Sequence, residues 1–127
     1  MSKHILVVDD EEGIVRILEI NLKMEGYEVD TASCGADALK LLLTNHYDLL
    51  ISDIMMPEMD GLELLEHIRQ SPALAELPVI LLTAQSTYND ITRGYARGTD
   101  LYLTKPFSPA ELKVWVSRIL NNEVDAA

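Results

Sequence analysis

Short apolar segments alternate with amphipathic segments along the whole chain. The apolar segments, each of strand length, are His4 to Val8, Glu28 to Ala32, Asp48 to Ser52, Val79 to Leu82 and Leu101 to Leu103. In the segments that follow them, apolar residues recur three or four positions apart, which is typical of helices that bury one face. The pattern therefore predicts five strands, each followed by a helix.

The helices have recognisable ends. They are predicted at Glu12 to Glu25, Ala36 to Asn45, Gly61 to Gln70, about Ser86 to Arg97, and from Pro109 onward. Ser33 is expected to N-cap the second helix, Gly26 and Gly98 follow the ends of the first and fourth, and Pro109 suits the first turn of the last. The side chains expected to face inward are Ile14, Ile17, Leu18 and Leu22, then Ala38, Leu41 and Leu42, then Leu62, Leu65 and Ile68, and finally Leu112, Val116, Ile119 and Leu120.

Five strand–helix units in sequence predict one α/β domain with a parallel sheet and helices on both faces. Right-handed crossovers favour the doubly wound strand order 2-1-3-4-5. The two most apolar strands belong at the centre, and the strand from Glu28 to Ala32 at an edge. We expect the domain to span residues 1–122 and residues 123–127 to be a disordered tail, which could be a truncated linker to a further domain.

Composition narrows the class of protein. No apolar run in the 127 residues approaches the roughly 18 that would span a membrane, and no leader pattern precedes the first strand, so a cytoplasmic protein is expected. The 10 Lys and Arg against 21 Asp and Glu give a formal charge of −11, which disfavours binding to nucleic acid or to anionic lipid. Cys34, the single cysteine, excludes an internal disulfide and is expected to be a packed loop residue.

Polar residues stand where the predicted strands end. Asp9 and Asp10 follow the first strand, Asp53 the third, Thr83 the fourth, and Lys105 comes shortly after the fifth. Because functional groups of such sheets collect at the carboxyl ends of the strands, the three carboxylates are expected to share one pocket. Clustered carboxylates repel one another, and a hard divalent cation would remove that penalty.

The ligand set at this edge is all oxygen, which favours Mg²⁺, or Mn²⁺, over zinc. The histidines His4, His46 and His67 show no ligand spacing and are interpreted as ordinary surface or packing residues. With a metal beside it, one carboxylate could attack a phosphoryl donor, while an ammonium and a hydroxyl stabilise the transferred group.

Four motifs in this order resemble the signature of response-regulator receiver domains. They are Val7-Val8-Asp9-Asp10-Glu11, Asp53-Ile54-Met55-Met56-Pro57-Glu58-Met59-Asp60-Gly61, Leu82-Thr83-Ala84 and Tyr102-Leu103-Thr104-Lys105-Pro106-Phe107. The resemblance covers about residues 3 to 120 and implies a flavodoxin-like fold. It also implies that Asp53 accepts the phosphoryl group, that Asp10 binds Mg²⁺ directly and Asp9 through water, and that the backbone carbonyl of Met55 is a further ligand.

The resemblance also implies a switch. Lys105 would pair with Asp53 and later with its phosphoryl group, and the Lys105-Pro106 peptide would be cis. Thr83 would move toward the phosphoryl group while the Tyr102 ring turns inward. The partner face expected beside Tyr102 consists of Ile91, Tyr95 and Trp115, although Tyr95 and Trp115 could instead merely cover the edge of the core.

The function implied is a phosphorylation-controlled switch of a two-component system. A sensor histidine kinase or a phosphotransfer protein would phosphorylate Asp53, and the altered face would control an effector or form a homodimer. The alternative is a Mg²⁺-dependent aspartyl-nucleophile phosphohydrolase, but such enzymes usually show Asp-x-Asp after the first strand, and here the aspartates are adjacent. A nucleotide-binding fold is disfavoured because no glycine-rich loop follows the first strand.

Overall fold

The computed structural model of the chain describes residues 2–56, 58–83, 99, 101–105 and 107–121. Its strands are β1 (His4–Val8), β2 (Glu28–Ala32), β3 (Leu49–Asp53), β4 (Val79–Thr83) and β5 (Leu101–Thr104). Its helices are α1 (Glu12–Met24), α2 (Gly35–Thr44), α3 (Gly61–Gln70) and α5 (Pro109–Leu120). None of the helices within the described ranges has the length and apolar character that crossing a membrane would require.

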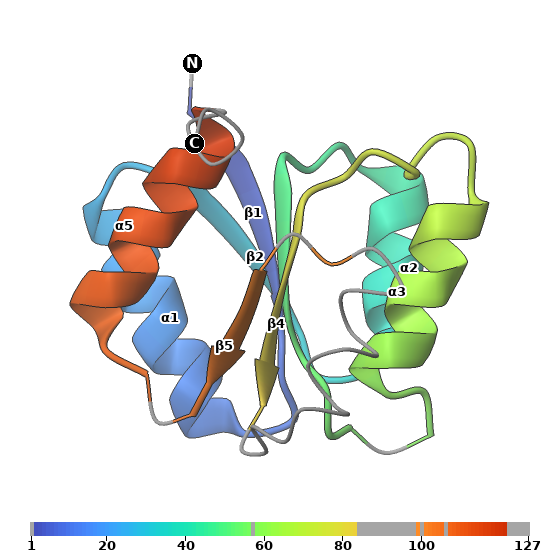
Figure 1. Ribbon diagram of the computed structural model, residues 1–127, viewed down its shortest axis with the longest axis horizontal. Coiled ribbons are helices and arrows are strands. Elements are labelled where there is room, and N and C mark those ends of the chain that lie inside the picture. The colour runs from blue at the N-terminus through green and yellow to red at the C-terminus, as the bar shows by residue number, and fades with distance from the viewer. Residues whose placement is uncertain (1, 57, 84–98, 100, 106, 122–127) are drawn as a thin grey trace.

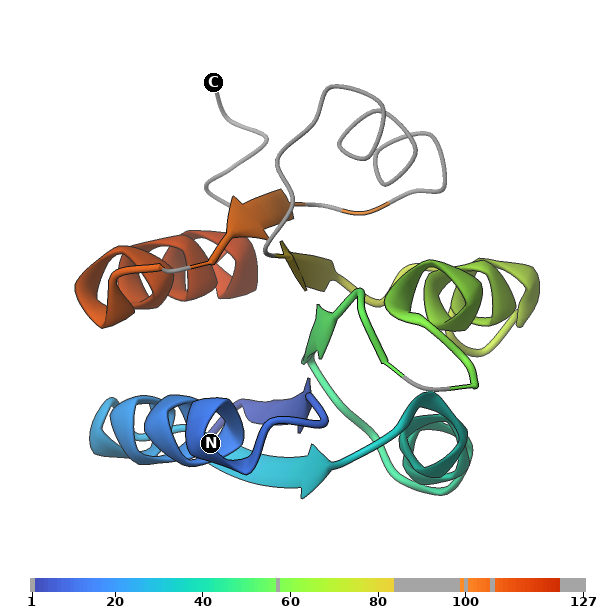
Figure 2. The ribbon, with the colours of Figure 1, turned by 90° about the horizontal axis from the view of Figure 1, so that it is seen from below.

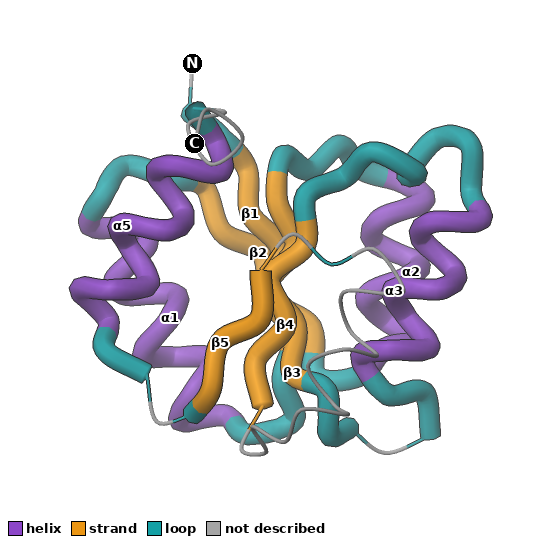
Figure 3. Tube along the Cα trace, in the orientation of Figure 1, coloured by secondary structure: helices purple, strands orange, loops and turns teal. Residues whose placement is uncertain are grey.

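The strands form one parallel sheet in the order β2-β1-β3-β4-β5, as predicted. The sheet is the central layer, with α1 and α5 on one face and α2 and α3 on the other (Figures 1 and 2). Figure 3 shows the strands running side by side through the middle of the domain, so their carboxyl ends meet at one edge of the sheet. The loops that lead into β3 and β4 lie at the opposite, amino edge.

Each face of the sheet has its own apolar core. The first core, between the sheet and α1 and α5, includes Leu18, Leu22, Ile51, Leu82 and Val116. The second core, between the sheet and α2 and α3, includes Leu6, Leu50, Leu65, Leu81 and Tyr102. The central strands β3 and β4 are buried along their whole length, because successive side chains of a strand point to opposite faces and both faces are covered.

Most helix ends agree with the sequence prediction. Gly26 has a φ of +92° just after α1, and Pro109 occupies the first turn of α5. Asp60 and Ser108 cap α3 and α5 by accepting hydrogen bonds from backbone N–H groups three positions on. Cys34 is half-buried, as expected for a packed loop residue.

Two local predictions were wrong. Ser33 does not cap α2: Cys34 stands at the N-cap position, and no side chain there accepts a hydrogen bond. Ile17 was placed on the buried stripe of α1, but its side chain is 46% exposed. The buried arc of α1 centres on Leu18 and Leu22 and is narrower than the apolar stripe of the sequence, since the helix rests on only one side of the sheet.

Some predictions fall on residues outside the described ranges. These are the fourth helix at residues 86–97 with Gly98 at its end, the face residues Ile91 and Tyr95, the peptide between Lys105 and Pro106, and the tail at residues 123–127.

Candidate functional site

The sheet register brings the predicted carboxylates together. Val8 of β1 lies opposite Ser52 of β3, so Asp9 and Asp53, one position further along, are neighbours across the two strands. The backbone N–H of Asp9 bonds to the carbonyl of Ala32 in β2, which fixes where this residue leaves the sheet. Asp9 and Asp53 are both buried, with 1% and 3% of the residue surface exposed.

Strand alternation decides which way each site residue points. Asp9, Asp53 and Lys105 each stand two positions after a residue that packs in the first core, so they share that face. Thr83 stands two positions after Leu81, which packs in the second core opposite Tyr102. Thr83 and Tyr102 therefore lie on one face, and the three charged side chains on the other.

Three carboxylates form a compact acidic cluster at this edge. One oxygen from each of Asp9, Asp10 and Asp53 lies within 4.8 Å of the others, and Asp10 is exposed while the other two are buried. Carboxylate oxygens this close, with one side open to water, suit a hard cation that keeps part of its hydration shell. The donor set thus fits Mg²⁺ or Mn²⁺.

Lys105 holds the cluster together electrostatically. Its Nζ lies 2.9 Å from Oδ2 of Asp9, 3.4 Å from Oδ1 of Asp53 and 3.4 Å from Oε1 of Glu11. Its backbone N–H bonds to the carbonyl of Thr83, which anchors the end of β5 to β4. The predicted pairing of Lys105 with Asp53 is present, and the contact with Asp9 is shorter.

The surroundings shift the pKa values of both partners. Burial, followed by the neighbouring charge of Asp9, raises the pKa of Asp53 to about 6, against the opposing effects of Lys105 and of the Met55 backbone N–H. Burial would lower the pKa of Lys105, but its hydrogen bond to Asp9 and the charges of Asp53, Asp9 and Glu11 outweigh that effect and raise it. The ammonium thus stays charged beside a carboxylate that is costly to ionise.

The loop after β3 approaches the strand that carries Asp53 so closely that it requires glycine. A Cβ on Gly61 would clash with the carbonyl oxygen of Asp53 and lie 2.9 Å from the Cα of Ile54. The N–H of Gly61 bonds to the carbonyl of Ile54, and Glu58 adopts a left-handed φ of 67° in the same loop. The start of α3 therefore presses against the backbone that carries Asp53.

Sequence reasoning missed two residues of the site. Glu11 contacts Lys105, and its N–H donates to Oδ1 of Asp9, so it orients that carboxylate. Gly61 shapes the loop under Asp53. The run of acids after β1 was a signal for Glu11, whereas the role of Gly61 depends on a distance between backbones that the sequence does not show.

The proposed partner face is described only in part. Trp115 is half-buried against the first core, with the guanidinium of Arg118 5.5 Å from the centre of its ring, and Val114 is 50% exposed. Tyr102 is buried. Because Ile91 and Tyr95 lie outside the described residues, whether these side chains form one surface stays a prediction.

Comparison with known proteins agrees with this geometry. The family model described as the response regulator receiver domain matches residues 5–117. The chain belongs to the response-regulator receiver domain family. This receiver domain is 45% identical over 127 residues to the alkaline phosphatase synthesis transcriptional regulatory protein PhoP of Bacillus subtilis, covering all of this chain and 52% of that protein. It is 38% identical to the transcriptional regulatory protein SrrA of Staphylococcus aureus, over 94% of this chain and 48% of that one.

Solved structures show the same fold. A response regulator from Chloroflexus aurantiacus matches with a TM-score of 0.91 and 38% identity, covering 95% of this chain and 99% of that chain. The chemotaxis protein CheY4 of Vibrio cholerae matches with a TM-score of 0.89 and 32% identity, covering 94% and 99%. The receiver domain spans about half the length of the curated relatives it matches.

Proposed function

We propose that this receiver domain is a switch that accepts one phosphoryl group on Asp53 from a sensor histidine kinase or a phosphotransfer protein. The observation that carries the proposal is the position of Asp53: a buried carboxylate with the Lys105 ammonium 3.4 Å away, within 4.8 Å of two further carboxylates. A carboxylate held beside both a fixed cation and a metal-binding cluster is suited to nucleophilic attack on phosphorus.

The transfer is an in-line displacement. An oxygen of Asp53 forms the new O–P bond as the P–N bond to a donor imidazole breaks, and the imidazole keeps the electron pair and takes up a proton. Asp53 must be ionised to attack, and at neutral pH a group with a pKa of about 6 is mostly ionised. Lys105 then loses one of its carboxylate partners and gains a phosphoryl oxygen.

The metal would be held by Asp10, Asp53 and the backbone carbonyl of Met55, with Asp9 acting mainly through a water. When bound, Mg²⁺ would neutralise negative charge on the phosphoryl oxygens. Lys105 offsets part of the negative charge of the cluster, since it contacts Asp9 and Asp53 together.

The conformational change on phosphorylation would reach the partner face through Thr83 and Tyr102. Both side chains are buried and lie on the same face of the sheet, on the neighbouring strands β4 and β5. A pull on Thr83 toward a phosphoryl oxygen would change the packing beside Tyr102, because buried neighbours in a close-packed core move together. The partner face with Trp115 would then engage an effector or a second copy of the chain.

Phosphorylation with acetyl phosphate and Mg²⁺ tests this function. Intact-mass spectrometry should show one added phosphoryl group, lost on treatment with base and absent in Asp53→Asn. Asp37→Asn, which removes an exposed carboxylate on α2, is the matched control and should be phosphorylated normally. Release of many phosphates per protein molecule without a stable adduct would instead indicate the phosphohydrolase.

A further inference from the structure

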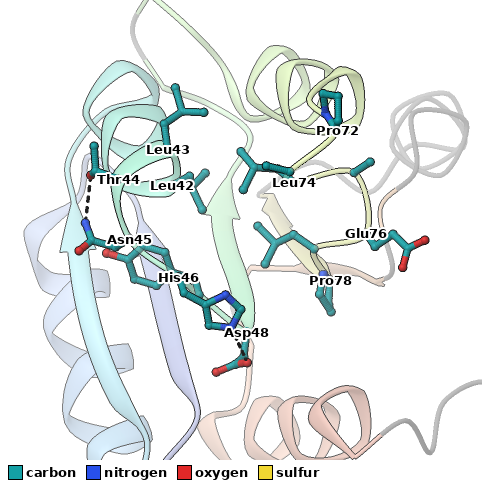
Figure 4. Close-up of a pocket in the computed structure, with 14 residues that line it drawn as sticks. Leu42, Leu43, Thr44, Asn45, His46, Asp48, Pro72, Leu74, Glu76 and Pro78 are labelled. Atoms are coloured by element: carbon teal, nitrogen blue, oxygen red, sulfur yellow. Dashed lines mark hydrogen bonds and ion pairs between the residues drawn. The ribbon is translucent and has the colours of Figure 1, made fainter.

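Two loops at the amino edge of the sheet enclose an open groove of about 820 Å³. One wall is formed by the end of α2 and residues 44–48, and the other by residues 72–78, between α3 and β4 (Figure 4). Since all strands are parallel and both loops precede strands, this amino-edge groove lies at the opposite end of the domain from Asp53. Occupation of the groove would leave the acceptor site open.

Hydrogen bonds fix the second wall. Nη1 of Arg69 donates to the carbonyl of Ala75 at 3.2 Å and to the carbonyl of Leu77 at 2.6 Å. Within the loop, the N–H of Leu74 bonds to the carbonyl of Ser71, and that of Leu77 to the carbonyl of Leu74. The loop therefore consists of consecutive hydrogen-bonded turns, and Arg69 of α3 holds them in place.

The first wall is fixed in the same way. The side-chain amide of Asn45 donates to the carbonyl of Leu41 and to Oγ1 of Thr44, whose hydroxyl in turn donates to the carbonyl of Lys40. His46 Nε2 lies 3.3 Å from Oδ1 of Asp48. Because both walls are held before anything binds, a ligand would not have to order them, which lowers the free-energy cost of binding.

The surface of the groove is apolar at its centre. Leu42, only 3% exposed, and the half-buried Leu74 point toward one another across it (Figure 4), and Leu43 beside them is 61% exposed. Pro72 and Pro78 add apolar surface to the second wall. A concave apolar surface with an exposed anchor position is typical of a binding site.

The rim of the groove is acidic. Asp48 and Glu76 lie on opposite walls, and the lining, all of it described, contains neither Lys nor Arg. Burial disfavours the charged form of Asp48, but the His4 N–H, His46 and Lys3 outweigh it and hold the pKa of this carboxyl below its ordinary value. Asp48 is therefore ionised at neutral pH, with Lys3 near it and the guanidinium of Arg69 behind the second wall.

We propose that the amino-edge groove binds a segment of another polypeptide in which an apolar anchor residue is flanked by Lys or Arg. The anchor would pack on the exposed Leu43 and the half-buried Leu74, and the basic side chains would meet Asp48 and Glu76. A second copy of this chain is disfavoured as occupant, because it would bring the same acidic rim to the interface.

The probe is a synthetic peptide of about 12 residues with leucine at helical spacing and lysine elsewhere. It is titrated into ¹⁵N-labelled protein with saturating Mg²⁺ and about 150 mM salt. These conditions weaken the attraction of the basic peptide to the acidic cluster of Asp9, Asp10 and Asp53. Amide shifts should centre on residues 43–48 and 72–78 and saturate. Leu43→Asp should weaken binding about tenfold, because it removes the apolar contact and adds no buried charge to the free protein.

Met24→Asp is the matched control, since Met24 is an exposed apolar residue of α1, and it should bind like the parent. Glu76→Gln should weaken binding and Glu28→Gln should not. Leu43→Asp should still be phosphorylated by acetyl phosphate, which shows that the acceptor site is intact. Equal binding by all variants, equal binding of a peptide with glutamate in place of lysine, or the absence of shifts would overturn the proposal. Groove shifts that depend on protein concentration without peptide would also overturn it, in favour of self-association.

Discussion

Nζ of Lys105 lies closer to Asp9, at 2.9 Å, than to Asp53, at 3.4 Å. The ammonium is thus paired most closely with a carboxylate of the acidic cluster that is expected to hold the metal. Metal and lysine carry like charges and compete for the same acidic cluster, so the cation that supports Asp53 also weakens the metal site.

Lys105→Gln should therefore bind Mg²⁺ more tightly and accept phosphate more slowly. Removing the ammonium frees Asp9 and relieves repulsion of the metal, a gain of about 1 kcal/mol or roughly fivefold in Kd. Isothermal titration calorimetry measures the first effect, and acetyl phosphate kinetics the second. Weaker Mg²⁺ binding by the variant would show that Lys105 orients the metal-binding carboxylates and does not compete with the metal.

Asp10→Asn should abolish most of the stabilisation that Mg²⁺ gives the parent protein. Asp10 is the exposed member of the cluster, so its replacement leaves the fold intact while removing a charged ligand. The rise in Tm with added Mg²⁺ should shrink to a small fraction of the parent value, as expected when Kd increases about tenfold or more. Asp37→Asn should keep the full rise.

The metal-free protein should be more stable at pH 5 than at pH 7.5 through Asp53. Its pKa is raised to about 6 in the folded state, so the folded protein binds more protons than the unfolded chain between about pH 4 and pH 6. This contribution is fully present below the unfolded pKa and is lost as pH rises through 6. Between pH 5 and pH 7.5, the free energy of unfolding should fall by about 1–2 kcal/mol through this group.

Urea denaturation in EDTA at both pH values measures this effect, and Asp53→Asn isolates it. The parent and the variant should differ in their pH dependence by that amount, and Asp53→Asn should be the more stable protein at pH 7.5. An identical pH dependence in the two proteins would mean that folding does not raise the pKa of Asp53.

Gly61→Ala should destabilise the domain by about 2 kcal/mol and slow phosphorylation. The added methyl group clashes with the carbonyl of Asp53, so either the acceptor strand or the start of α3 must shift. Gly13→Ala is the control: nothing lies within 4 Å of its new Cβ, and alanine in α1 should stabilise the protein by about 0.5 kcal/mol. Thermal unfolding and acetyl phosphate kinetics on both variants test the pair.

Much of the fold could be predicted from the sequence because the signals are local. The strands were located to within a residue or two at each end, since buried parallel strands are continuous apolar runs. Helix caps were harder. The error at Ser33 arose because Cys34 takes the cap position without a side-chain bond, so cap chemistry gave no guide.

The clustering of the carboxylates at one edge of the sheet was predictable for a second reason. In a parallel sheet every strand ends at the same edge, so residues that follow different strands must meet once the strand order is known. Burial could not be predicted with the same certainty. The exposure of Ile17 and Leu43 depends on how far each helix is covered by its neighbours, which no single segment encodes.

By itself, the sequence determined the parallel sheet and the meeting of Asp9, Asp10 and Asp53 at one edge, for which periodicity and strand order are sufficient. The pairing of Lys105 with Asp53 was expected from the family resemblance, and the shared face of Thr83 and Tyr102 follows from the strand register. Only the tertiary structure decided that Lys105 contacts Asp9 more closely than Asp53, that Gly61 presses on the acceptor strand, and that two loops build an acidic-rimmed groove. These features depend on distances between segments far apart in the chain, which are set by packing.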